Sequence, residues 1–316
     1  MTADIAMDLG SSHIRVYVKD QGVVIQEPSI VAFNRAQNEI QAFGIEAKQA
    51  FEHSMGHLVE FHPIKRGVIV DYTLTEKLIR HYLLKALGKI GVQKQRLCFA
   101  LSGQMNDVQE RTLISAALAA GARDISLLSA CKASALAAGL DIDQAMGNLV
   151  VNIGGGHTDI ELISVGETVA KHAVSIGGMD FDDVIIRYLK EEHQLLIGKA
   201  TAEDIKIHMS LGEITILGRD LMTAIPKSIN IQTEEIVATY YEYMNRIIQG
   251  IHSVLSTAPP ELCADIYDRG IVLAGGGALL RGLEDYLTQK TGLLTVLVHD
   301  PLLSVVIGCG KVDIWK

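Results

Sequence analysis

The feature that most constrains this chain is an internal repeat of a strand–turn–strand unit. Residues 6–13 read Ala-Met-Asp-Leu-Gly-Ser-Ser-His, and residues 150–157 read Val-Val-Asn-Ile-Gly-Gly-Gly-His. In both copies an apolar stretch ends in Asp or Asn, turns through small residues to a His, and enters a second apolar stretch. Self-similarity of this kind marks a duplicated structural unit. We therefore expect two related domains that face each other, and 316 residues are enough for two.

Strand-like and helix-like patterns alternate around the two copies of this unit. Strands are expected at 3–8, 14–18, 23–33, 96–101, 125–128, 148–153, 158–165, 212–217, 220–225 and 271–274. Helices are expected at 73–88, 107–120, 133–138, 180–193, 233–256 and 278–289, with another that opens at Thr201. The helix at 73–88 is predicted to begin with a capping box of Thr73 and Glu76. Alternating strands and helices place the chain in the α/β class.

Composition and charge exclude several classes of function. The longest apolar runs are far shorter than the ~20 residues that a membrane span requires. The first ten residues carry no basic and apolar leader, so we expect a cytoplasmic protein. A net charge of −9 argues against nucleic acid as a partner. The four cysteines are far apart in the sequence, which indicates buried thiols and not disulfides or a zinc site.

The small residues of the repeated turn suit phosphate binding. Because glycine has no Cβ, backbone N–H groups can converge on an anion there, and two such turns would hold a polyphosphate from both sides. Asp8, at the end of the first strand, could hold a hydrated Mg²⁺ that bridges the phosphates. The alternative for any one turn is a plain tight hairpin, but a third glycine cluster, Gly275–Gly277, also follows a predicted strand.

Two other nucleotide-binding motifs fail on this sequence. A Walker A loop would need Ser or Thr after Gly198-Lys199, where Ala200 stands, and Gly in place of His193. A Rossmann fingerprint that starts at Gly275 would need a third glycine where Leu280 stands.

Three segments resemble the phosphate and adenosine loops of the actin superfamily. They are Asp8-Leu9-Gly10, Asn152-Ile153-Gly154-Gly155-Gly156 and Leu273-Ala274-Gly275-Gly276-Gly277-Ala278-Leu279-Leu280. Within that superfamily the chain is similar, over nearly its whole length, to the MreB family of bacterial actin-like rod-shape-determining proteins. The similarity is strongest at 26–32, 195–198, 201–206, 218–221, 259–262 and 268–273.

The resemblance implies an actin-like (ribonuclease H-like) fold of two duplicated α/β domains with a nucleotide cleft between them. The first domain would span 1–145 with an insertion subdomain at about 29–70. The second would span 146–316 with an insertion at about 180–235, and the C-terminal helix would cross back to the first.

The resemblance also assigns roles by position, with ATP and Mg²⁺ as the expected cofactors. The first phosphate loop would be Ser11, Ser12 and His13, the second Gly154, Gly155, Gly156 and His157, and Asp8 would be the metal-binding residue. Glu203, Asp204 and Lys206 would meet the ribose and base, and Gly275, Gly276, Gly277 and Ala278 would lie against the adenosine. The alternative for 203–206 is a solvated helix face with a Glu203–Lys206 pair.

Both histidines stand where the family has uncharged polar residues. An imidazole with a pKa near ~6.5 could become cationic beside a triphosphate and strengthen its binding as the pH falls. The alternative is that His13 and His157 are neutral and make ordinary hydrogen bonds.

Two departures from the family concern hydrolysis. The family has Asp where Asn152 stands, and Glu-Glu-Pro, with a water-positioning Glu, where Ser129-Ala130-Cys131 stands. Loss of a general base costs about 10²–10⁴ in rate. ATP hydrolysis is therefore expected to be slow or absent, unless Glu161, Asp159 or another acid substitutes for the missing acids.

A basic segment offers a membrane contact. Residues 76–96 contain six Lys or Arg residues against one acid, and Ile90 and Val92 form an apolar tip between them. Such a segment suits an anionic membrane surface, and MreB-like proteins place a membrane-inserting loop at this position. The alternative is a solvated helix face with two core residues after it.

The function that the resemblance implies is that of an ATP-binding cytoskeletal protein. It would polymerise on the inner face of the cell membrane with itself, and other MreB paralogues are candidate partners. There it would determine cell shape through the cell-wall synthesis machinery. Two rival functions are a small-molecule kinase of the actin superfamily, which needs an acidic base in the cleft, and a non-polymerising regulator of another MreB.

Overall fold

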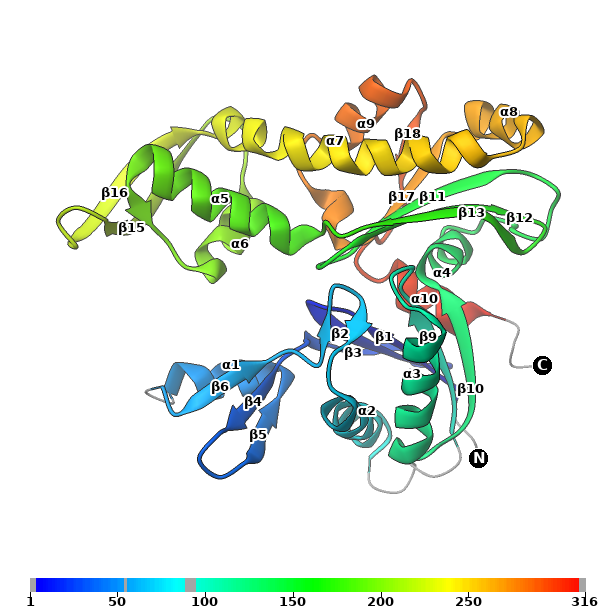
Figure 1. Ribbon diagram of the computed structural model, residues 1–316, viewed down its shortest axis with the longest axis horizontal. Helices are drawn as coiled ribbons and strands as arrows, with labels where there is room; N and C mark the ends of the chain where they lie inside the picture. The colour runs from blue at the N-terminus through cyan, green and yellow to red at the C-terminus, as the bar shows by residue number, and fades with distance from the viewer. Residues whose placement is uncertain (1–3, 54–55, 89–94, 313–316) are drawn as a thin grey trace.

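The computed structural model describes residues 4–53, 56–88 and 95–312. The chain forms two halves, which lie one above the other in Figure 1, and each half is built on a five-stranded sheet. The first sheet comprises β1 (Asp4–Leu9), β2 (His13–Val18), β3 (Gly22–Pro28), β9 (Gln95–Leu101) and β10 (Ala122–Ser129). The second comprises β11 (Asn148–Ile153), β12 (Thr158–Ser164), β13 (Glu167–Val174), β17 (Ile271–Ala274) and β18 (Thr295–Leu297).

The two sheets have the same topology. Their strand orders are β3-β2-β1-β9-β10 and β13-β12-β11-β17-β18. In each, three strands form an antiparallel meander, and two further strands add in parallel on the other side of the first strand. This equivalence confirms the duplicated α/β fold that the sequence repeat predicts.

Helices pack against both sheets. In the first half these are α2 (Tyr72–Leu87) and α3 (Asp107–Ala120), and in the second α5 (Gly178–His193), α7 (Thr233–Thr257), α8 (Pro260–Arg269) and α9 (Leu283–Thr291). The long helix α7 buries Ile236, Tyr240, Met244, Ile247, Ile251 and Val254, which is the helical spacing expected from the sequence. Within the described residues, no helix is long and apolar enough to span a bilayer.

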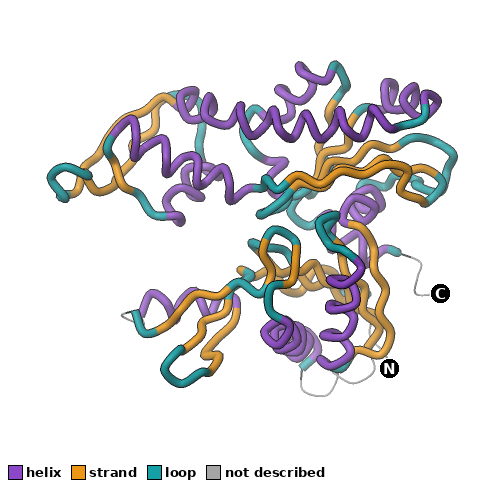
Figure 2. The backbone as a smooth tube through the Cα atoms, in the orientation of Figure 1, coloured by secondary structure: helices purple, strands orange, loops and turns teal. Residues whose placement is uncertain are grey.

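Each half also carries a smaller three-stranded sheet, and both project to the left in Figures 1 and 2. The first consists of β4 (Val31–Asn34), β5 (Glu39–Phe43) and β6 (Leu58–Phe61), with α1 (Gly44–His53) beside it. The second consists of β14 (Leu195–Leu196), β15 (Glu213–Asp220) and β16 (Pro226–Gln232), with α6 (Lys199–His208) nearby. A short hairpin, β7 (Ile64–Lys65) and β8 (Val68–Ile69), precedes α2.

Two short helices lie where the halves meet. Helix α4 (Ala130–Ala137) packs Cys131 and Ala135 against Val150 and Ile163 of the second sheet. Helix α10 (Ser304–Lys311), although it is near the C-terminus, belongs to the apolar cluster of the first sheet. That cluster contains Ala6, Cys98, Ala130, Ala133, Val305, Val306 and Cys309. The last helix therefore crosses back to the first half, while the domain boundary near residue 145 stays a prediction.

Several local predictions from the sequence are wrong. Helix α2 has Asp71 as its N-cap, with the carboxylate accepting from the Leu74 N–H, so it does not begin with a Thr73–Glu76 capping box. Residues 220–225 are not a strand, because Asp220 accepts hydrogen bonds from the N–H groups of Met222 and Thr223 and so stabilises a turn.

Two other elements are divided. The expected strand at 23–33 is two strands in different sheets, β3 and β4. The expected helix at 278–289 is a 3₁₀ turn, η1 (Gly276–Leu279), followed by α9. Of the four cysteines, all free thiols, three are buried as expected, whereas Cys263 is only partly buried.

Candidate functional site

A cleft of about 300 Å³ lies between the two halves. Twelve of the predicted nucleotide- and metal-binding residues line it: Asp8, Ser11, Ser12, His13, Gly154, Gly155, His157, Glu203, Lys206, Gly275, Gly276 and Gly277. Gly156, Asp204 and Ala278 are not among the lining residues. The structure therefore brings most of the predicted residues of both halves together at one site. The volume of this cleft is typical of sites for small-molecule ligands.

The two predicted phosphate loops have the same internal hydrogen bond. The Gly10 N–H donates to the His13 carbonyl at 3.1 Å, and the Gly154 N–H donates to the His157 carbonyl at 2.9 Å. In the first loop a Cβ on Gly10 would lie only 2.7 Å from the His13 oxygen. The repeated turn thus needs its first glycine for a steric reason in addition to any role in binding.

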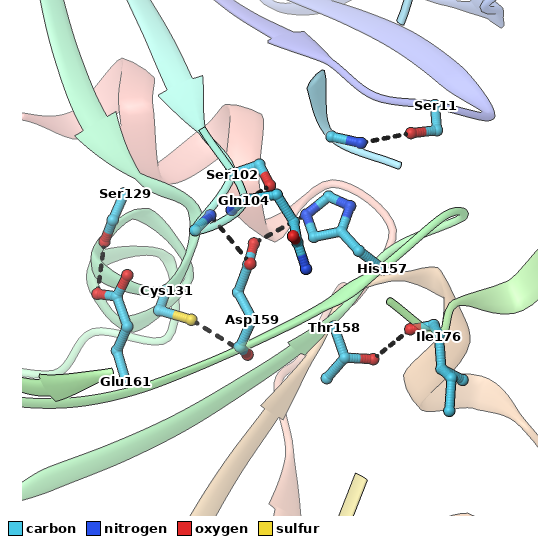
Figure 3. Close-up of polar contacts among 12 residues, drawn as sticks. Ser11, Ser102, Gln104, Ser129, Cys131, His157, Thr158, Asp159, Glu161 and Ile176 are labelled. Carbon is cyan, nitrogen blue, oxygen red and sulfur yellow. Dashed lines mark hydrogen bonds and ion pairs between the residues drawn. The ribbon is translucent and has the colours of Figure 1, made fainter. Parts of the chain in front are cut away.

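The loops from the two halves touch each other. A Cβ on Gly155 would lie 2.5 Å from Cβ of Ser12, and a Cβ on Gly156 would lie 2.9 Å from Oγ of Ser11. The same Ser11 hydroxyl, which is buried, accepts a hydrogen bond of 3.0 Å from the Gly67 N–H (Figure 3). Gly156 therefore serves the contact between the loops and not the wall of the cleft, which corrects its predicted placement.

The N-terminus of α5 rests on the second phosphate loop. The N–H groups of Gly178 and Met179 donate to the carbonyls of Gly154 and Gly155 at 2.9 and 2.8 Å. A Cβ on Gly177 would lie 2.6 Å from three backbone atoms of that loop. Sequence reasoning missed this contact, although a Gly-Gly pair directly before an amphipathic helix was a signal for it.

Helix α6 contributes Glu203 and Lys206 to the cleft. The Lys206 ammonium lies 2.7 Å from an Asp182 carboxylate oxygen and donates to the Gly178 carbonyl at 2.8 Å. Burial raises the pKa of Asp182 to about 6, against the opposing effect of Lys206. Lys206 is therefore paired with Asp182 and not with Glu203. The alternative of a solvated helix face with a Glu203–Lys206 pair does not describe this lysine.

Asp204 lies away from the cleft. Its carboxylate is exposed and 2.9 Å from Nδ1 of His208, one helical turn further along α6. Residues 203 and 206 share one face of the helix while residue 204 points about 100° away from 203, as helical geometry requires. The prediction that Asp204 meets the nucleotide is therefore wrong for this conformation.

The glycine cluster after β17 closes the far side of the cleft. Gly275 has a φ of 82°, and a Cβ there would lie 2.3 Å from the Ile153 carbonyl oxygen. This glycine is required both by its left-handed backbone and by its approach to β11. Ala278 is buried within the core of the second half and does not line the cleft.

Asp8 is paired with an arginine that sequence reasoning did not single out. Arg15 stands directly opposite Asp8 in the β1–β2 ladder, and its Nη1 donates to the Asp8 carboxylate at 3.3 Å. Burial raises the pKa of Asp8, against the opposing charge and hydrogen bond of Arg15. The hairpin turn that separates the two residues fixes this cross-strand pairing.

The pKa values of the two phosphate-loop histidines are shifted in opposite directions. Burial lowers the pKa of His13, with a smaller contribution from Arg15, and its Nδ1 lies 2.9 Å from the Ser12 hydroxyl. At His157 burial also disfavours the cation, but the negative charges of Asp159 and Asp8 outweigh it and the pKa is raised. The shifts thus favour the cationic hypothesis for His157 and the neutral one for His13.

The positions of the missing acids do face the cleft. Asn152 and Ala130 both line it, and within the described part of the chain the Asn152 amide oxygen is buried without a hydrogen-bond partner. Glu161 does not line the cleft, since its carboxylate accepts from the Ser129 hydroxyl (Figure 3) and also from the Thr168 hydroxyl.

Asp159, the other acid considered as a substitute, is also held elsewhere. One carboxylate oxygen accepts from the Gly103 N–H at 3.0 Å, and the other lies 3.0 Å from Nε2 of His157 (Figure 3). Neither Asp159 nor Glu161 is therefore placed to polarise a water molecule in the cleft directly.

The site fits a nucleotide better than it fits a divalent cation. Glycine turns from both halves line the cleft, and without side chains they leave the backbone open to a ligand. For Mg²⁺, the one carboxylate at the predicted position already has a guanidinium beside it. Among the described residues there is no group of three or more His, Cys, Asp or Glu side chains that could hold a metal ion.

The predicted membrane tip, Ile90 and Val92, lies outside the described residues. Three basic side chains of the surrounding segment are paired within the first half. Lys85 lies 2.6 Å from a Glu27 oxygen, Arg96 pairs with Asp4, and Arg80 lies 3.7 Å from Glu76. The segment therefore presents less free positive charge than its sequence suggests.

Comparison with known proteins agrees with this architecture. The profile of the MreB/Mbl protein family matches residues 2–314. The cell shape-determining protein Mbl of Bacillus subtilis (strain 168) is 37% identical over 314 residues, which cover 97% of this chain and 94% of that protein. The cell shape-determining protein MreB of Escherichia coli (strain K12) is 36% identical over 320 residues, covering 98% and 92%.

Solved structures show the same fold. A crystal structure of MreB5 of Spiroplasma citri bound to ADP superimposes with a TM-score of 0.91 at 31% identity, covering 98% of this chain and 95% of that one. The double helical filament of MamK gives a TM-score of 0.82 at 20% identity, covering 98% of both chains, which shows a shared fold only. The chain therefore has an actin-like fold and belongs to the MreB/Mbl family, whose curated relatives are cell shape-determining proteins.

Proposed function

We propose that this protein binds ATP in the cleft between its halves and polymerises into filaments that help to determine cell shape. The observation that carries the proposal is the pair of equivalent glycine turns, Gly10–His13 and Gly154–His157, which meet across the cleft. Each turn follows the carboxyl end of a strand, and the N–H groups of Gly178 and Met179 at the start of α5 hold the second turn in place. Two glycine turns that face each other suit a polyphosphate, because residues without side chains let it approach the backbone.

Related structures support a nucleotide at this position. MreB5 of Spiroplasma citri has been crystallised with ADP and with AMPPNP, and both structures have a TM-score of 0.91 with this chain. The pocket in this chain contains the turns, the α6 side chains and the Gly275 cluster in one continuous wall. ATP is the nucleotide that this family resemblance favours.

Self-association is the second part of the proposal. A head-to-tail contact that does not close on itself gives an open polymer, and the MamK structure of the same fold is a filament. We propose that the polymer lies on the inner face of the cell membrane, where it would contact the wall-synthesis machinery. Other MreB paralogues are further candidate partners.

Sedimentation and electron microscopy test the proposal. Purified protein at micromolar concentration is expected to form sedimentable filaments with ATP, and calorimetry is expected to show one ATP site per chain. Pelleting only when a second MreB is added would support the rival function of a regulator. No ATP binding, or no polymer with either nucleotide or paralogue, would contradict the proposal.

A kinase is disfavoured by the acids of the cleft. Activation of an acceptor hydroxyl needs a carboxylate that is free to take its proton. Asp8 is paired with Arg15 and Asp182 with Lys206, while Asn152 and Ala130 stand where acids were expected, so a kinase would have to use the third cleft acid, Glu203. ATP consumption that depends on an added small molecule would favour the kinase instead.

A further inference from the structure

The pair of Asp8 and Arg15 places a permanent cation inside the cleft. The two residues are direct partners in the β1–β2 ladder, and Nη1 of Arg15 lies 3.3 Å from Oδ2 of Asp8. The side chain of Arg15 is only 11% exposed and that of Asp8 17%. Both residues line the cleft beside the first phosphate loop. A guanidinium does not lose its charge at any physiological pH.

This cation stands where a divalent ion would be attracted. A carboxylate that holds a hydrated Mg²⁺ must face the ion with its negative charge unopposed. Here the guanidinium charge already lies against that carboxylate, and an ion brought to the same oxygens would be repelled by it. The neutral Asn152 at the equivalent position of the second turn adds no charge to attract the ion.

Arg15 also has hydrogen-bonding capacity to spare. Its contact with Asp8 uses Nη1, and Nε is buried with no partner among the residues that the structure describes. A guanidinium carries five N–H donors in a planar fork that matches phosphate oxygens. The cleft therefore contains a charged, partly unpaired donor group close to the loop that is proposed to hold phosphates.

We propose that Arg15 supplies, beside the phosphates, the positive charge that a divalent cation would otherwise supply, so that this protein binds ATP with little dependence on Mg²⁺. The inference rests on the proposed ATP site and identifies its counter-charge. Asp8 then acts mainly as the group that positions Arg15.

Calorimetry of ATP binding, with MgCl₂ and separately with excess EDTA, tests the inference on the purified full-length chain. For the wild type the two dissociation constants are expected to agree within about threefold. In Arg15→Met, which removes the charge and keeps the apolar stem, affinity in EDTA is expected to fall by at least about tenfold. Affinity in MgCl₂ should fall less, because Asp8 is then free to attract the ion.

Two further variants serve as controls. Arg15→Lys keeps the charge without the planar fork and should retain most of the binding in EDTA. Arg123→Met removes an exposed arginine of β10 that is paired with Asp124, and it should behave as the wild type. Circular dichroism establishes that each variant is folded, and the wild-type comparison stands even if Arg15→Met does not fold.

The outcomes separate this inference from the function on which it rests. ATP binding by the wild type in MgCl₂ and its loss in EDTA would overturn the role of Arg15 and leave the ATP site intact. An equal ratio of the two dissociation constants in wild type and Arg15→Met would overturn it as well. Absence of ATP binding under both conditions would contradict the proposed function itself, and the inference with it.

Discussion

Nε2 of His157 lies 3.0 Å from a carboxylate oxygen of Asp159, two residues further along the chain. Burial works against a positive charge on this imidazole, but the carboxylates of Asp159 and Asp8 together outweigh it, so the pKa of His157 is raised above its usual 6.5. The other ring nitrogen, Nδ1, is buried with no hydrogen-bond partner in the described chain. A protonated His157 therefore has one N–H committed to Asp159 and a second, at Nδ1, that is buried without a partner.

The first prediction concerns the pH dependence of ATP binding. Because the pKa of His157 is raised, its charge is present below pH 6.5 and is lost as the pH rises through the higher value in the folded protein. ATP affinity is thus expected to decrease with increasing pH across neutrality, more steeply in the wild type than in His157→Thr. Calorimetric titrations between about pH 6 and pH 8 measure this.

His13→Asn is the matched control for that experiment, since the pKa of His13 is shifted in the opposite direction, below its usual 6.5. The terminal phosphate of ATP gains negative charge as the pH rises, whichever protein binds it. The quantity to compare is therefore the difference between the pH profiles of ATP affinity of the wild type, His157→Thr and His13→Asn. Superimposable profiles for wild type and His157→Thr would reject a charged role for His157.

The second prediction concerns the contact of α5 with the second phosphate loop. In Gly177→Ala the new Cβ would lie 2.6 Å from three backbone atoms of Gly155, Gly156 and His157. Since backbone atoms cannot move aside cheaply, we expect a loss of about 1–3 kcal/mol in the free energy of unfolding. Thermal unfolding should show a lower midpoint, together with weaker ATP binding.

Gly178→Ala provides the comparison at the neighbouring residue. A Cβ there would meet nothing closer than the Lys206 ammonium at 3.6 Å, which is an ordinary contact. Its unfolding midpoint should be close to that of the wild type. If the two variants are equally stable, the close approach of Gly177 does not limit the packing of the loop.

The third prediction is that ATP turnover is very slow or absent. Asn152 and Ala130 face the cleft at the positions of the missing acids, and neither side chain can accept a proton from water. Asn152→Asp with Ala130→Glu is expected to raise phosphate release, by up to about 10²–10⁴ if a base alone is missing. Phosphate release from polymerised protein is the measurement.

Two results would count against this argument. Wild-type turnover equal to that of a hydrolysing MreB would mean that another group orients the water. No gain in the double variant would mean that the missing carboxylates do not limit the rate, and the charge of Arg15 beside Asp8 would become the next candidate to change.

The fourth prediction concerns the membrane. The protein is expected to float with anionic liposomes and to lose this in Ile90→Asp with Val92→Asp, because the apolar tip would then carry negative charge. Added salt should weaken the wild-type binding, since exposed charges are screened over about 8 Å at physiological ionic strength. Flotation of the variant to the same extent as the wild type would exclude this tip as the anchor.

The sequence repeat was sufficient to predict the duplicated fold and most of the cleft. It worked because the small residues of both turns are demanded by sterics: Gly10 and Gly155 each have a neighbour closer than a Cβ allows. The family motif predicted Asp204 at the site together with its neighbours in the sequence. A helix, however, presents only some of its successive residues to one side, and Asp204 points away from the side that faces the cleft.

Other parts of the site depend on contacts between distant segments. The position of Gly177 matters only because α5 docks on a loop about twenty residues earlier, and Lys206 is useful only beside Asp182 of another helix. Arg15 was within reach of prediction, because the Gly10–His13 turn sets the register that places it opposite Asp8.

The return of α10 to the first half has a mechanical consequence. The backbone passes between the halves twice, in residues 138–147 after α4 and in residues 298–303 before α10. Two covalent crossings define an axis of rotation, so the halves can tilt about this line but cannot slide apart or twist freely. The small sheets, which lie far from the axis in Figure 1, then travel furthest for a given tilt. A small change in how closely the loops contact a ligand would thus produce a large displacement of the two small sheets.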